Sequence, residues 1–257
     1  MKKFLLIFLL FCFISAGCSK KEAPSDTYDK ILKRGYVIAG IREDAGVFGR
    51  VNKQGENEGF DIDLAGYIAE KFTGSKKNIK FKVLTPAERI EAASSGEADI
   101  VIAALSDTLS RRDLIDFSIP YYTAGQTAAV KKDSRIYNFS DLKDKVIIVV
   151  LGAASEQNIR RIMPAAKIVG YKSYKEAFDA LKKGKGDAVS TDDTILAGFL
   201  AENKGYRMLK NRISAEYYSI GIQKTEDKIL KKRLDAVIEE AKQNGYLKSL
   251  KEKWKLN

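Results

Sequence analysis

The chain has 257 residues, enough for two modest domains or one large one. It contains no histidine, which excludes Ser-His-Asp and Cys-His catalysis and every metal site that needs imidazole. The formal net charge is +11, but the basic residues are scattered and have acidic neighbours, so we expect a basic surface and no nucleic-acid partner.

The amino terminus has the pattern of an export signal. Lys2 and Lys3 precede an apolar run over residues 4–14, and small residues over 15–17 precede Cys18. We therefore predict a signal peptide over residues 1–17, too short in its apolar part to span a bilayer comfortably. The small residues before Cys18 resemble a bacterial lipoprotein cleavage site, so we expect lipidation of Cys18 and a polar tether over residues 18–27.

Cleavage before Cys18 would also remove Cys12, the other cysteine of the chain. The mature protein would then contain no disulfide and no thiolate metal site, and we expect neither a metal nor a cofactor.

After the tether, strands and helices alternate. We predict strands at 36–41, 79–84, 100–105, 126–131, 146–151, 167–171, 188–191 and 217–223. We predict helices at 28–34, 59–72, 86–95, 152–162, 174–183, 195–201, 227–244 and 246–254. In the second helix Ile62, Ala65, Ala69 and Phe72 form one buried stripe. The alternation indicates βαβ units, arranged as two successive α/β blocks with a helical closing segment.

The stretch over residues 103–122 suggests a binding loop. The apolar run 100–105 ends in small and hydroxylated residues, which places Ser106, Thr108 and Arg111 at the carboxyl end of a sheet. Arg111 offers a planar fork of donors for a carboxylate, and the Ser106 hydroxyl lies beside it. From these residues alone, an ordinary surface turn with solvated arginines is the commoner explanation.

Two segments carry a specific resemblance. Residues 106–122, with Thr108-x-x-Arg111 and Asp116-Phe117-Ser118-x-Pro120-Tyr121-Tyr122, and residues 59–72, GFDIDLAGYIAEKF, resemble hallmarks of the family 3 bacterial solute-binding proteins. These are the polar amino-acid receptors of ABC importers. The resemblance implies a two-lobed α/β fold of the type II periplasmic-binding-protein kind. Lobe 1 would contain residues 28–120 and 219–257, lobe 2 residues 126–213, and two hinge strands residues 121–125 and 214–218.

The resemblance also assigns a zwitterion site. Arg111 and Ser106 would bind the ligand carboxylate together with the backbone N–H of Ala154, at a helix start. The alternative for that stretch is a simple strand-to-helix turn. Asp192 would accept the ammonium while Asp193 caps the next helix, although both could merely be caps. The resemblance also places Ala104 among the residues that would contact the ligand.

Three further residues would contact the ligand side chain. Phe48 matches an aromatic residue that packs over the ligand, and Arg42 and Arg89 match basic residues of glutamate and aspartate receptors. Two converging guanidinium groups suit a second carboxylate. The alternative is ordinary ion pairing with neighbouring acids, namely Glu43 or Asp44 for Arg42, and Glu91 or Glu97 for Arg89.

We therefore expect an exported, lipid-anchored monomer that faces the periplasm or the cell exterior. It would bind glutamate or aspartate first and glutamine next, deliver the ligand to an ABC permease in the membrane, and catalyse no reaction. The alternatives are a dehydratase on the same fold, an amino-acid sensor or adhesin, and a receptor for another amino acid such as cystine.

Overall fold

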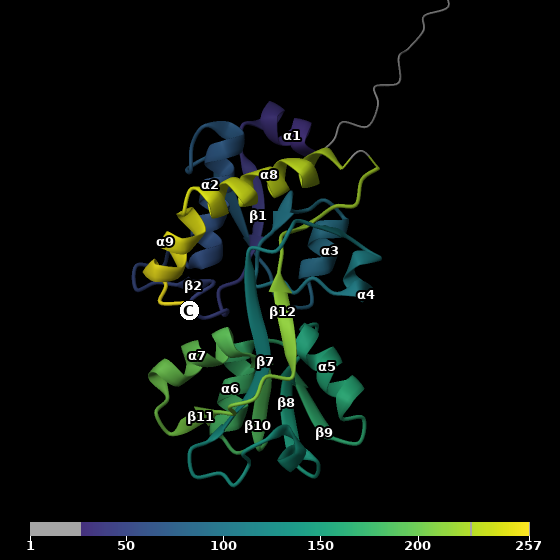
Figure 1. Ribbon diagram of the computed structural model, residues 1–257, viewed down its shortest axis with the longest axis vertical. Coiled ribbons are helices and arrows are strands. Elements are labelled where there is room, and N and C mark those ends of the chain that lie inside the picture. The colour runs from purple at the N-terminus through teal and green to yellow at the C-terminus, as the bar shows by residue number, and fades with distance from the viewer. Residues whose placement is uncertain (1–26, 227, 257) are drawn as a thin grey trace, which may run out of the picture.

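The computed structural model describes residues 27–226 and 228–256, which form two α/β lobes arranged along the long axis of the molecule (Figure 1). This arrangement confirms the expected two-lobed α/β fold. The predicted signal peptide, Cys18 and all of the predicted tether except Thr27 lie outside the described residues. No helix in the described ranges is both long enough and apolar enough for a membrane span.

The sheet of the first lobe combines early and late parts of the chain. Its order is β4-β1-β5-β13-β6. The strands are β1 (Val37–Ile41), β4 (Ile79–Val83), β5 (Ile100–Val101), β6 (Asp116–Phe117) and β13 (Gly221–Ile222). Strand β1 pairs in parallel with β4 and β5, whereas β13 pairs antiparallel with β5 and β6. The last part of the chain therefore returns to the lobe in which the described chain begins.

Helices cover this sheet, and a short ribbon formed by β2 (Arg50–Val51) and β3 (Asn57–Glu58) lies beside it. The helices are α1 (Thr27–Arg34), α2 (Phe60–Thr73), α3 (Arg89–Ser94), α4 (Leu109–Arg112), α8 (Ile229–Gln243) and α9 (Tyr246–Lys253). The predicted stripe on α2 is buried, as expected. Helices α8 and α9 pack against α2, which places the carboxyl-terminal segment on the first lobe (Figure 1).

The second lobe has a sheet in the order β11-β7-β10-β8-β9, with β12 added along β7. The strands are β7 (Tyr122–Lys131), β8 (Val146–Val150), β9 (Lys167–Tyr171), β10 (Ala188–Asp192), β11 (Tyr206–Met208) and β12 (Ser214–Tyr218). The helices are α5 (Ala154–Ile162), α6 (Tyr174–Lys182) and α7 (Asp193–Glu202), together with the 3-10 helix η1 (Phe139–Leu142). Each lobe has its own buried apolar core.

Two antiparallel strands, β7 and β12, run between the lobes (Figure 1). At their upper end, the Tyr121 N–H donates to the Tyr218 carbonyl at 2.9 Å, and the Ser219 N–H donates to the Leu105 carbonyl at 3.0 Å. The first bond joins the two crossing segments to each other, and the second ties them to the loop that follows β5. The sequence predicts a separate crossing segment over 121–125 followed by a strand, whereas β7 is continuous from Tyr122.

The strand predicted over 100–105 is shorter than expected, because β5 ends at Val101. Beyond it, side chains take up the backbone groups that a longer strand would use. Asp61 accepts from the Ala104 N–H at 2.7 Å, and Arg89 donates to the carbonyls of Ala103 and Ala104. Ala104 has a φ of 46°, a conformation that L residues rarely adopt, so these side-chain bonds hold a strained loop in place.

Candidate functional site

The predicted ligand-binding residues gather where the two lobes meet, and all of them are buried. They are Arg42, Phe48, Arg89, Ala104, Ser106, Arg111, Ala154 and Asp192. Three of them carry a positive charge and one a negative charge. Charges are seldom buried unless they are paired or hydrogen-bonded, so the partners of each side chain indicate what it can still bind.

Arg111 is a buried cation without a counter-ion among the described residues. Its Nη1 donates to the Ser106 carbonyl at 2.7 Å, and its Nη2 donates to the Gly152 carbonyl of the opposite lobe at 3.0 Å. Both acceptors are neutral, and the described residues include no ion pair for this guanidinium. Burial lowers the pKa of Arg111, while the negative charges of Glu216 and Asp192 oppose that effect. A bound carboxylate would supply the missing counter-charge.

Arg89 is held differently. Its guanidinium donates to the carbonyls of Pro86, Ala103 and Ala104 at 3.0–3.1 Å. These bonds fix the conformation of the loop that follows β5. Burial, followed by the like charges of Arg111 and Arg42, lowers its pKa to about 9. The sequence alternative, pairing with Glu91 or Glu97, is not what the structure has. Arg89 adds positive potential to the site and supports Ala104.

Asp61 supports the same loop and was not predicted as a site residue. Besides the Ala104 N–H, it accepts the Tyr121 hydroxyl at 2.8 Å. Burial raises the pKa of this carboxyl to about 7. Both oxygens are therefore engaged within the first lobe, and Asp61 positions the loop.

Asp192 stands at the carboxyl end of β10, where a ligand ammonium was expected. Its Oδ2 accepts a hydrogen bond from the Tyr218 hydroxyl, whereas no described residue donates to Oδ1. Burial, followed by the negative charge of Glu216, raises its pKa to about 7. Asp192 occupies the N-cap position of α7, but its side chain makes no capping hydrogen bond, so its carboxylate does not serve to cap the helix.

Asp193 has a structural role. The sequence suggested that it is the N-cap, the residue before the helix, but the structure differs. Asp193 is the first residue of α7. Its Oδ1 accepts from the N–H groups of Gly125 at 3.2 Å and Thr194 at 2.8 Å, and Arg212 forms an ion pair with its other oxygen. These contacts hold the start of α7 against β7.

Arg42 has a partner that changes its expected role. Its Nε donates to Asp44 Oδ1 at 2.9 Å and Nη2 bonds the same oxygen, while the guanidinium lies 4.5 Å from the centre of the Tyr174 ring. Burial opposes the charge, but Asp44 and Tyr174 outweigh it and raise the pKa of Arg42. Arg42 lowers the pKa of Asp44 although burial opposes this. Both side chains are therefore ionised and their opposite charges compensate each other. Arg42 is buried rather than solvated.

Phe48 lies in an aromatic cluster beneath these charges. Its ring centroid is 4.9 Å from that of Tyr122, 5.2 Å from Tyr218 and 5.3 Å from Phe60. Since the Tyr218 hydroxyl also donates to Asp192, this aromatic cluster is joined directly to that carboxylate.

Ala154 begins helix α5, and Ala153 at the N-cap makes no side-chain capping bond. The first N–H groups of a helix have no acceptor within it, so those of Ala154 and Ser155 are suited to an anion. Gly152 precedes them with a φ of 78°, and a Cβ there would lie 2.7 Å from the Ala87 Cα of the other lobe. A glycine is therefore required for this close approach.

The lobes are in direct contact around the site. The Tyr174 N–H donates to Asp44 Oδ2 at 3.0 Å, and Arg111 reaches Gly152 as described. The structure is thus a closed arrangement, which explains why every site residue is buried.

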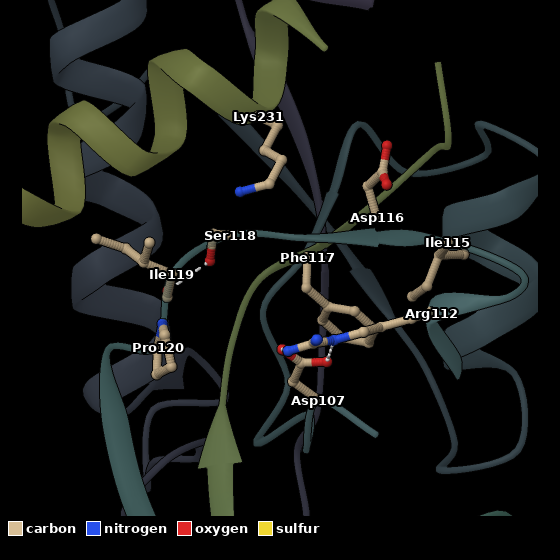
Figure 2. Close-up of a pocket in the computed structure, with 9 residues that line it drawn as sticks. All are labelled: Asp107, Arg112, Ile115, Asp116, Phe117, Ser118, Ile119, Pro120 and Lys231. Atoms are coloured by element: carbon tan, nitrogen blue, oxygen red, sulfur yellow. Dashed lines mark hydrogen bonds and ion pairs between the residues drawn. The ribbon is translucent and has the colours of Figure 1, made fainter. Parts of the chain in front are cut away.

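A separate hollow of about 370 Å³ lies on the surface of the first lobe (Figure 2). Figure 2 shows charged side chains around it, but each has a partner. Arg112 pairs with Asp107, and Lys231 reaches Asp235 at 2.6 Å. Asp116 accepts from Lys228 at 2.8 Å. This hollow contains none of the predicted ligand-binding residues.

Comparison with known proteins gives the same family as the two sequence segments. The model of the family described as "bacterial extracellular solute-binding proteins, family 3" matches residues 37–257. An ABC transporter glutamine-binding protein of Bacillus subtilis is 37% identical over 242 residues, covering 93% of this chain and 88% of the relative. A glutamine-binding protein of Geobacillus stearothermophilus is 38% identical over 236 residues, covering 85% and 90%.

A solved structure is also similar. The cysteine-binding protein of Campylobacter jejuni has a TM-score of 0.86 and 30% identity, with 89% of this chain and 92% of that chain covered. Sequence and structure thus agree, and the chain belongs to the bacterial extracellular solute-binding proteins, family 3.

Proposed function

We propose that the chain is the substrate-binding receptor of an ABC importer and that its ligand is a polar amino acid, glutamine before glutamate. Both relatives described above are named as glutamine-binding, and one is named as part of an ABC transporter. The site offers Arg111 to an α-carboxylate and Asp192 to an α-ammonium, the two charges that every free amino acid carries.

The Arg42–Asp44 pair is the observation that carries the choice of side chain. Within the described residues, Nη1 of the buried Arg42 has no acceptor, whereas Nε and Nη2 donate to Asp44 Oδ1 and the Tyr174 N–H donates to Asp44 Oδ2, so a ligand can still donate to the remaining lone pairs of the carboxylate. An amide supplies one acceptor and two donors, which matches both partners. A ligand carboxylate would approach Asp44 as a like charge, and a ligand guanidinium would approach Arg42 as a like charge.

This order differs from the one expected from the sequence, in which glutamate and aspartate came first. That expectation required Arg42 and Arg89 to converge on a second carboxylate. Arg42 instead has its own counter-ion, and Arg89 bonds three carbonyl groups. Glutamate remains the second candidate, because Arg89 still adds positive potential.

Calorimetric titration with glutamine, glutamate, cysteine and arginine tests the proposal. We expect glutamine to bind most tightly, glutamate and cysteine more weakly, and arginine not at all. Absence of binding by every amino acid would refute the receptor function. Glutamate binding about tenfold tighter than glutamine would refute the side-chain argument alone.

We propose binding without chemical conversion. A dehydratase needs a carboxyl group that reaches its substrate and transfers a proton. Asp61 has both oxygens engaged, and Asp192 faces a ligand ammonium in the proposed pose. Glutamine recovered chemically unchanged after prolonged incubation would agree with a receptor, and conversion to any product would refute it. A role in sensing or adhesion would use the same site, and loss of glutamine uptake on gene deletion distinguishes import from both.

We also propose that β7 and β12 act as hinges, since they are the strands that cross between the lobes. Ligand would then stabilise the closed arrangement described above. Small-angle scattering should show a smaller radius of gyration with glutamine than without it. An unchanged radius with bound glutamine would contradict a hinge.

The family description refers to extracellular proteins, and we propose that a lipid on Cys18 anchors this one to a membrane as a monomer. Cys18→Ser should move the protein from the membrane fraction to the soluble fraction. Retention of the variant in the membrane fraction would refute the anchor. Sedimentation of the soluble variant tests the monomeric state.

A further inference from the structure

Glu216 is a buried acid that the site as described above leaves without a function. It lies on β12, where Glu216 and Tyr218 are buried while Ala215 and Tyr217 are exposed. Alternate residues of a strand point to the same face, so Glu216 and Tyr218 share one. Because the Tyr218 hydroxyl bonds Asp192, that face is directed toward the ammonium end of the site.

The hydrogen bonds of Glu216 leave its charge uncompensated. Oε1 accepts from the Asn158 side chain at 2.9 Å and from the Ser214 hydroxyl at 2.6 Å, two neutral donors on one oxygen. Within the described residues Oε2 has no donor and Glu216 has no ion pair, although the residue is only 4% exposed. A buried carboxylate in this state is costly unless a cation approaches it.

Asn158 fixes where this carboxylate lies. It is on α5, one turn beyond Ala154, and its amide also donates to Gln126 at 2.9 Å. Gln126 in turn bonds the Ser155 carbonyl and the Ser190 hydroxyl, two residues before Asp192. Glu216 is therefore held by a buried network that includes both the start of α5 and the strand that carries Asp192.

Electrostatics agree with this placement. After burial, Glu216 is the largest influence on the pKa of Asp192, which it raises, and on the pKa of Arg111, where it opposes the lowering. Asp192 and Glu216 thus repel each other. A cation between them would relieve that repulsion, and Arg111 already has two donors committed to carbonyl groups.

We propose that Glu216 is a second carboxylate of the ammonium subsite, so that the α-ammonium of the ligand is held between Asp192 and Glu216. This inference rests on the proposed function, because it takes the ligand to be an amino acid. It makes Glu216 a determinant of specificity: the receptor selects amino acids over the same molecules without the α-amino group.

The variant Glu216→Gln tests the inference. Glutamine at this position keeps an acceptor for Asn158 and Ser214 but removes the charge. We expect the affinity for glutamine to fall about tenfold or more, as for loss of a charge-assisted hydrogen bond. The affinity for glutaramate, which is glutamine without its α-amino group, should not fall in a competition assay. Glu202→Gln, an exposed site on α7, is the matched control and should leave both affinities unchanged.

A second measurement separates a charge effect from a structural one. Besides Glu216, the groups that influence Asp192 are Tyr218 from β12, Asp193 from α7, Arg89 from α3, Arg111 from α4 and Tyr174 from α6. Removing the like charge of Glu216 lets Asp192 ionise more readily, so the pH at which glutamine affinity is half lost should move downward. A merely structural role would not move it.

The outcomes are distinct. Weaker glutamine binding with an unshifted pH midpoint, or equal losses for glutamine and glutaramate, would make Glu216 structural and overturn the inference. Unchanged glutamine affinity would place it outside the site. If the native protein itself binds no amino acid, the proposed function fails and the inference fails with it, whereas normal native binding with an unaffected variant overturns the inference alone.

Discussion

Replacing Asp44 with asparagine should shift the proposed preference for glutamine toward glutamate. The substitution removes the counter-ion of a buried guanidinium, and its single amide oxygen can accept from Arg42 or from the Tyr174 N–H but cannot replace both carboxylate oxygens. Arg42 would then present an uncompensated positive charge to the ligand side chain. A ligand carboxylate can neutralise that charge, whereas an amide cannot.

The magnitude follows from the contact that is lost. Arg42 donates to Asp44 at 2.9 Å, a charge-assisted hydrogen bond. A glutamate carboxylate that replaces this partner gains about 1.5–3 kcal/mol, and the amide of glutamine gains less. The ratio of glutamate to glutamine affinity should therefore rise by about tenfold to a hundredfold. We expect a change in this affinity ratio at the lower end of the range, about tenfold, because the Asp44 side chain is 26% exposed and solvent screens its charge.

The assay is a pair of titrations, glutamate and glutamine, on the native protein, on Asp44→Asn and on Glu43→Gln. Glu43 is the adjacent residue and is exposed, so the control makes the same change in net charge one position away. Its ratio should equal the native one. An Asp44→Asn variant that keeps the native ratio would refute the role assigned to the Arg42–Asp44 pair.

Four further predictions concern other parts of the site and the stability of the fold. Arg111→Ala should lose about 2–5 kcal/mol of glutamine binding, because it leaves the ligand carboxylate buried without a partner; Arg112→Ala, which removes an exposed arginine, should bind normally in the same titration. Asp61→Ala should lower the free energy of unfolding by about 2–6 kcal/mol in denaturant melts, since it orphans two buried donors; native stability in that variant would contradict its loop-supporting role. Glutamine affinity should fall as the pH is lowered from about 8 to about 6, because Asp192, whose pKa burial and Glu216 raise to about 7, must be ionised to accept an ammonium. The ligand-free fold should respond in the opposite sense: a raised folded-state pKa contributes stability that is lost as the pH rises through about 7, so thermal melts should show greater stability at pH 6 than at pH 8.

Local patterns in the sequence were sufficient for the elements that local patterns govern. Helix α2 buries the residues that its spacing selects, and the alternation of strands and helices gives two α/β lobes. Arg111 was expected in the segment that follows the strand over 100–105, and it lies there, on the short helix α4 rather than at the strand end itself. These predictions depend on neighbours within a few turns, which a single sequence displays directly.

The partners of buried charges could not be predicted, because they are distant in sequence. Asp44 bonds Tyr174 across 130 positions, and Asp61 bonds Ala104 across 43. A weak signal was present for Asp61, an acid between Phe60 and Ile62 at the start of an apolar helix, where a solvated residue would be out of place. No comparable signal marked Glu216, whose strand shows alternating burial only once its pairing with β7 is known.

The distribution of charges between the lobes links specificity to closure. Arg111 and the Arg42–Asp44 pair belong to the first lobe, whereas Asp192 and Tyr174 belong to the second. If β7 and β12 act as hinges as proposed, water solvates each group when the lobes separate, and on closure each group must find a partner or remain buried without one. A zwitterion would provide the partners for Arg111 and Asp192, so the free energy of binding would contain the free energy of closure. Asp44 illustrates the consequence, because it both balances Arg42 and accepts the Tyr174 N–H of the other lobe. A substitution of Asp44 changes the free energy of closure for every ligand, but it changes side-chain recognition only for ligands that contact the Arg42–Asp44 pair. The ratio of two affinities, and not either affinity alone, therefore measures the contribution of Asp44 to specificity.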